Sequence, residues 1–136
     1  MQSEDKLESS KELFEVYDGY ARTLRTWLVT YGIGAPVIFL TNDSLREDLV
    51  STGSARAVGS WFLVGVAIQV VIAAMNKAAM WGCYYGKLNK NFRLKIRFKI
   101  ANWLARQFWI DLLADLATIT LFTYSTVSVF TLVTNP

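Results

Sequence analysis

Three long apolar runs, separated by polar segments, dominate the sequence. They cover residues 24–41, 61–86 and 108–133, and each contains at most two charged residues. A helix needs about 20 mainly apolar residues to cross the hydrocarbon core of a membrane. The second and third runs exceed this length. The first reaches it if a preceding helix continues into it, and by length alone it also fits a buried core helix. The pattern predicts a single all-α membrane domain over residues 1–136 with three transmembrane helices.

The segments outside these runs predict two further helices. Over residues 4–24, Leu13, Tyr17, Tyr20 and Leu24 recur at helical spacing. We expect an amphipathic cytosolic helix here that packs against copies of itself or the basic segment; a solvated helix without a role is the alternative. In the loop over residues 42–60, the sequence from Ser44 to Glu47 fits a capping box. We therefore expect one short helix on the external face, starting at Ser44 and ending before Gly53.

Charge is unevenly distributed and predicts the orientation. Residues 87–106 contain seven Lys or Arg and no acidic residue, whereas residues 1–25 carry a net charge of −2 and residues 42–60 a net charge of −1. Basic residues in short loops stay on the cytoplasmic side. Arg22 and Arg25, just before the first span, point the same way. We expect the N-terminus inside and the C-terminus outside, in a bacterial inner (plasma) membrane.

The basic segment allows two conformations and two roles. Residues 92–100 alternate as in a strand, but Leu88, Phe92, Ile96 and Ile100 also form a helical stripe. An unpaired strand beside a membrane would leave its backbone unsatisfied, so we favour a helix that continues into the third span. Its cations either anchor the protein to lipid phosphates or bind an anionic ligand such as a nucleotide or oligonucleotide. The candidate binding residues are Lys87, Lys90, Arg93, Lys95, Arg97 and Lys99.

Polar residues inside the apolar runs are the candidate pore residues. Charges there are costly and usually face a partner or water. Lys77 could pair with Asp111 or Asp115 and lock two helices together, within or between subunits. Alternatively, the carboxylates could surround a pore mouth and favour cations. The candidates are Gln69, Asn76, Lys77, Asp111, Asp115, Thr118 and Ser125. Seven or more hydroxyl residues in the third run favour a helix that is mostly buried in an oligomer.

Two sets of small residues predict where helices meet or bend. Ala74, Ala78, Gly82 and Gly86 are spaced by four, which allows another helix backbone to approach closely. In the first run, Gly32, Gly34 and Pro36 predict a hinge or a packing bend, because proline removes one backbone hydrogen bond.

Composition disfavours an enzyme. The chain has no histidine and one cysteine, so the commonest general base and the usual metal ligand sets are missing. We expect no catalytic residue, no metal and no cofactor. The hypothesis is a homo-oligomeric channel or pore, in contact with membrane lipid and gated from the cytoplasmic side by an anionic ligand or a partner protein. A non-conducting scaffold or accessory subunit and a holin-like pore former are the alternatives. In layout the chain resembles the small membrane effectors of bacterial phage-defence systems, which implies control by a nucleotide signal.

Overall fold

In the described part of the chain, three long helices form a bundle with two short helices at its ends. The computed structural model describes residues 2–89 and 95–134; for residues 2–12, 14 and 87 it describes only the backbone. These parts form α1 (Gln2–Thr41), α2 (Asp43–Ser51), α3 (Ala55–Leu88), α5 (Ile96–Leu104) and α6 (Phe108–Thr134), and they contain no strand. Three stretches are long and apolar enough to cross a membrane: Glu15–Thr41, Ala55–Gly86 and Phe108–Thr134. The chain is therefore a multi-pass membrane protein.

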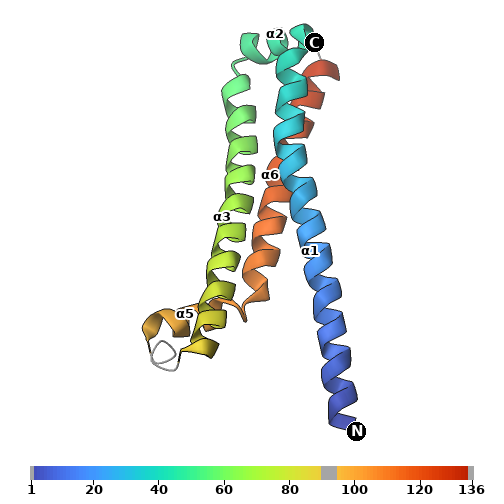
Figure 1. The fold of residues 1–136 in the computed structure, drawn as a ribbon. Coiled ribbons are helices and arrows are strands. Elements are labelled where there is room, and N and C mark those ends of the chain that lie inside the picture. Colours follow the sequence, from blue (N-terminus) through green and yellow to red (C-terminus); the bar gives the residue numbers. More distant parts are fainter. Residues whose placement is uncertain (1, 90–94, 135–136) are drawn as a thin grey trace.

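Helix α1 is a single element, in which the amphipathic segment over residues 4–24 continues into the first span, as the short first apolar run required. It runs for 40 residues and includes Pro36. Its length is about 60 Å at 1.5 Å per residue, twice the hydrocarbon thickness. Its N-terminal part extends beyond the bundle, at the end where α5 lies (Figure 1). We call this end, with Lys95, Arg97, Lys99 and Arg106, the basic end; the C-terminus and α2 lie at the opposite end.

The short helix between the first two spans begins at a different residue from the one expected. Asn42, not Ser44, is the N-cap, and its side chain accepts a hydrogen bond from the backbone N–H of Leu45. The hydroxyl of Ser44 donates to the same Asn42 oxygen at 2.7 Å. Gly53 has a φ of 70°, which glycine adopts without strain, and it turns the chain between α2 and α3. Helix α3 begins at Ala55, so the expected loop over residues 42–60 is shorter than the sequence suggested.

The basic segment is helical over residues 96–104, but it does not continue into the third span. Residues 105–107 separate α5 from α6. Helix α5 packs back against α3, and the two small residues at that end of α3 make room for it. A Cβ at Gly82 would lie 2.7 Å from Cβ of Ala101, and a Cβ at Gly86 would overlap the ring of Phe98. The expectation of one continuous helix is wrong because α5 has a docking surface of its own.

The interior of the bundle changes character along its length. On the α2 side, the buried residues are mostly apolar and include Leu49, Val58, Phe62 and Phe122, with Ser125 as a buried polar residue among them. Towards the basic end, the polar residues Gln69, Asp115 and Thr118 of α3 and α6 are buried together with small or aliphatic ones such as Ala79 and Ala114. The outer faces are apolar and exposed, as Trp27, Leu63 and Phe130 show, which suits contact with lipid or with other copies.

Candidate functional site

A layer of three polar side chains is buried between α3 and α6. Gln69 and Thr118 have no exposed surface, and Asp115 is 8% exposed. The Gln69 Nε2 group donates to Oδ1 of Asp115 and to Oγ1 of Thr118, each at 3.0 Å. Thr118 in turn donates to the Ala114 carbonyl at 2.9 Å. Gln69 Oε1 is buried without a hydrogen-bond partner among the described residues. This layer gives Asp115 a hydrogen-bond donor but no cation.

A second polar layer lies nearer the basic end, one helical turn away along α6 and about two turns away along α3, and it joins all three spans. Nδ2 of Asn76 on α3 donates to both carboxylate oxygens of Asp111 on α6, at 2.9 and 3.0 Å. Arg25 on α1 approaches the same carboxylate, with Nη2 3.4 Å from Oδ1. The charged partner of Asp111 is therefore Arg25. We call the two layers together the polar seam.

Phe122 closes the seam on the side of the apolar core. Its ring stacks on Phe62 with the centroids 5.2 Å apart and is only 3% exposed. The ring fits between two glycines, since a Cβ at Gly32 would lie 2.5 Å from its Cζ and a Cβ at Gly65 would overlap it. Beyond it lies Ser125, whose hydroxyl is buried and has no partner in the described part of the chain. The Phe122 ring thus separates Ser125 from the polar seam.

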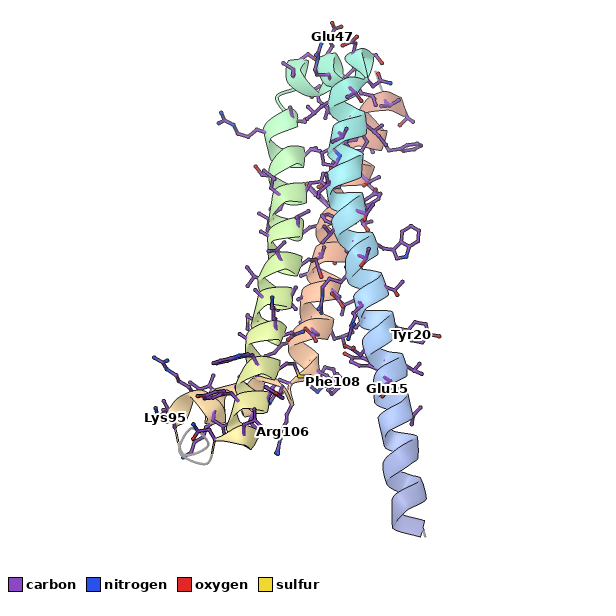
Figure 2. The ribbon with its side chains drawn as sticks, in the orientation of Figure 1. Glu15, Tyr20, Glu47, Lys95, Arg106 and Phe108 are labelled. Atoms are coloured by element: carbon purple, nitrogen blue, oxygen red, sulfur yellow. The ribbon has the colours of Figure 1, made fainter. Side chains whose placement is uncertain are left out.

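At the basic end, the seam opens into a cleft of about 580 Å³. Parts of α1, α3, the turn after α5 and the start of α6 form its walls, and Asn76 and Asp111 of the seam contribute to it. Figure 2 shows Arg106 and Phe108 at this end of the bundle, with Glu15 and Tyr20 on the neighbouring α1. Besides Asn76 and Asp111, the lining residues include Tyr17, Asp18, Arg22, Arg25, Met80, Leu104, Arg106 and Phe108. We call it the basic-end cleft.

Lys77 does not take the position that the sequence suggested. Its side chain is exposed on the outside of α3. Among the described residues, neither Asp111 nor Asp115 forms an ion pair with it. Within one subunit, the predicted lock is therefore not formed: on α3, Lys77 follows Asn76 by one residue, and it is Asn76 that faces α6. A pair between Lys77 of one subunit and a carboxylate of another stays a prediction.

The predicted small-residue face is divided between two environments. Gly82 and Gly86 are buried against α5, whereas Ala74 and Ala78 are exposed. A spacing of four drifts by about 40° per step around a helix of 3.6 residues per turn, so its two ends face different ways. In the predicted hinge, α1 continues through Gly32, Gly34 and Pro36, and Gly32 is a close-packing position against Phe122.

Of the predicted binding cations, the three whose side chains the structure describes do not line the cleft. Lys95, Arg97 and Lys99 are exposed around α5. Lys90 and Arg93 lie outside the described residues, as does the side chain of Lys87. The sequence interpretation instead overlooked Arg22, Arg25 and Arg106 as site residues. Each lies next to the start of an apolar run, where a cation is easily interpreted only as a flank that sets orientation.

Comparison of the chain with protein-family models, with curated proteins and with solved structures finds no match. No group of three or more Cys, Asp or Glu residues in the described part of the chain is arranged to hold a metal ion.

Proposed function

We propose that the protein is a small membrane channel, built from several copies of the chain and opened from its basic end by an anionic ligand. The observation that carries this proposal is the polar seam, which extends from the cleft into the bundle and stops at Phe122. Asp111, Asp115 and Thr118 lie along one face of α6 over about 10 Å. Buried carboxylates, amides and hydroxyls in a membrane helix are costly unless they are paired or face water.

The orientation of the proposed channel follows from its charge. The basic end faces the cytoplasm, because Lys and Arg in short loops are retained there. The N-terminus is then inside and the C-terminus outside, in the plasma membrane of a bacterium. An anionic ligand from the cytoplasm reaches the cleft directly in this orientation.

Several copies are needed because one subunit has no room for a lumen. Phe62 and Phe122 fill the space between the helices near α2. The outer faces of the spans, in contrast, are mostly apolar and exposed, and they suit contacts between copies as well as with lipid. In the proposed open state, α3 and α6 separate and their polar faces turn towards a lumen shared by the copies.

The Arg25–Asp111 pair offers a way for a ligand to act on the seam. It is the ion pair that joins α1 to α6 in the described structure. An anion bound to Arg25 competes with Asp111 for the guanidinium group and so loosens α1 from α6. Asp111 keeps its hydrogen bonds to Asn76 when this happens.

Ion flux from proteoliposomes tests the proposal, with Phe122→Ala and Phe130→Ala as a matched pair. Both changes remove a phenyl ring from α6, but Phe122 is 3% exposed and closes the seam, whereas Phe130 is 66% exposed on the outside. We expect Phe122→Ala to increase the basal flux and Phe130→Ala to leave it unchanged. Equal flux in the two variants, or none in either, contradicts the channel.

A non-conducting scaffold is the second candidate, and the internal pairing of the seam favours it. Gln69 donates to Asp115 and Thr118, and Thr118 also bonds to backbone carbonyls of α3 and α6, all inside one subunit. In a scaffold, the seam serves only to align α3 with α6. The same experiment separates the two candidates, because a scaffold conducts in neither variant while its oligomer persists.

A further inference from the structure

The basic-end cleft is lined by arginines that lack some of their possible partners among the described residues. Arg106, in the turn between α5 and α6, is exposed and has no ion pair among the described residues. Nε of Arg25 is buried without a hydrogen-bond partner in that same part of the chain. An unsatisfied buried donor carries a desolvation penalty that a ligand oxygen would remove. The cleft is therefore lined by one exposed guanidinium group without an ion pair, that of Arg106, and by one that has an unpaired buried Nε, that of Arg25.

The bond between Arg25 and Asp111 leaves Arg25 available to a ligand. The Nη2–Oδ1 distance of 3.4 Å is longer than the 2.7–2.9 Å of a good charge-assisted hydrogen bond. Both Asp111 oxygens already accept from Asn76, at 2.9 and 3.0 Å. The carboxylate thus remains hydrogen-bonded when the guanidinium turns towards an anion in the cleft.

The start of α6 adds to the attraction for an anion. Gln107 and Phe108, at the N-terminal end of this 27-residue helix, line the cleft beside Arg106. The first backbone N–H groups of a helix have no intrahelical acceptor, and the helix dipole favours negative charge there. Two arginines beside a helix N-terminus suit a phosphate group, because the planar guanidinium fork matches phosphate oxygens.

The apolar lining residues indicate which kind of phosphate-containing molecule fits the cleft. Met80, Leu104 and Phe108 give the cleft apolar surface beside its cations. The cleft also lies where α6 begins to span the membrane, because Phe108 is the first residue of that span. Lipid phosphate groups lie at this level of a bilayer. A molecule with a phosphate group and an attached apolar body therefore fits both the chemistry and the position.

We propose that the basic-end cleft binds the phosphate group of an anionic phospholipid, through Arg25 and Arg106. Met80, Leu104 and Phe108 contact the apolar part of the lipid next to its headgroup. This inference takes from the proposed function only that the site receives an anion. Lipid binding is measured without a flux assay. If the protein does not conduct ions, the lipid-binding proposal is unaffected, and if it does not bind the lipid, the flux assay still tests the channel.

The test compares binding of phosphatidylglycerol and phosphatidylcholine to the full chain by native mass spectrometry, with Arg106→Gln and Arg97→Gln as a matched pair. Both arginines are exposed at the basic end, but Arg97 lies outside the cleft. We expect Arg106→Gln to weaken phosphatidylglycerol binding about tenfold, as loss of one charged hydrogen bond implies. Arg97→Gln should change it by less than about twofold, and neither should change phosphatidylcholine binding.

Three results would overturn the inference. Equal losses in the two variants would mean that diffuse surface charge attracts the lipid. Unchanged binding in Arg106→Gln would remove Arg106 from the site. Inorganic phosphate or glycerol phosphate that displaces phosphatidylglycerol at comparable concentration would identify a free phosphate compound as the ligand and leave the apolar wall without a role. Thermal unfolding of Arg106→Gln in phosphatidylcholine nanodiscs, expected to match the parent, ensures that lost binding does not reflect lost folding.

Discussion

Replacing Gly32 with alanine places a methyl group in the space that the Phe122 ring occupies. The new Cβ would lie 2.5 Å from Cζ of Phe122 and 2.5 Å from Cγ2 of Val66. Ordinary carbon contacts are about 3.5–4 Å, so the neighbours must move by about 1 Å. Phe122 cannot yield easily, because its ring is 3% exposed and packs against Phe62 and Tyr31.

The free energy of unfolding is expected to fall by about 1–2 kcal/mol. Overpacking a filled interior costs about 1–3 kcal/mol. Replacing glycine with alanine within a helix returns about 0.5–1 kcal/mol of that. Gly34→Ala is the matched control on the same helix, since a Cβ there meets nothing within 4 Å. It should therefore stabilise the protein by about 0.5–1 kcal/mol.

Unfolding by sodium dodecyl sulfate in mixed micelles, followed through the fluorescence of the five tryptophans, measures both changes. A double-mutant cycle with Phe122→Leu locates the cause, because Gly32→Ala should cost about 1 kcal/mol less when the smaller side chain is present. If Gly32→Ala is as stable as Gly34→Ala, the close approach of α1 to Phe122 does not exist and the packing argument fails.

Three further changes test the seam, the α2 cap and the docking of α5. Gln69→Leu should destabilise the protein by about 3 kcal/mol, because it leaves the buried Asp115 carboxylate without its hydrogen-bond donor. The double variant Gln69→Leu/Asp115→Leu should recover part of this stability, and detergent unfolding measures both variants. Asn42→Ala should cost about 1 kcal/mol through loss of the α2 cap, and Ser44→Ala clearly less, in the same assay; equal costs would restore Ser44 as the cap. Phe98→Ala should free α5 from α3 and speed trypsin cleavage within α5 several-fold, whereas an unchanged cleavage rate would show that the contact with Gly86 does not hold α5 in place.

The main elements could be predicted because each depends on its own stretch of chain. Three apolar runs gave three spans, and the faces of α3 and α6 with Gln69, Asn76, Asp111, Asp115 and Thr118 follow directly from helical spacing. In the structure, Asp115 and Thr118 of α6 are buried on one face with Phe122, Ser125 and Val129, and Asp111 faces α3 through its hydrogen bonds to Asn76.

Element boundaries were less predictable where two local signals competed. Asn42 and Ser44 are both good N-cap residues, and only the backbone conformation at Asn42 decides between them. The division of the basic segment into α5 and a turn depends on contacts of Phe98 and Ala101 with the glycines of α3. Those contacts join residues of two different helices, so local sequence patterns do not predict them.

The sequence by itself determined the number of spans and the distribution of charge, because the transfer of a segment into a membrane depends on its own composition. Only the tertiary structure decided which polar groups meet. Asp111 faces Asn76 and Arg25, and Lys77 faces outward, because periodicity assigns a residue to a face of its helix but does not say which helix packs against that face. The same packing brought Arg25 and Arg106, which are 81 residues apart, to one cleft.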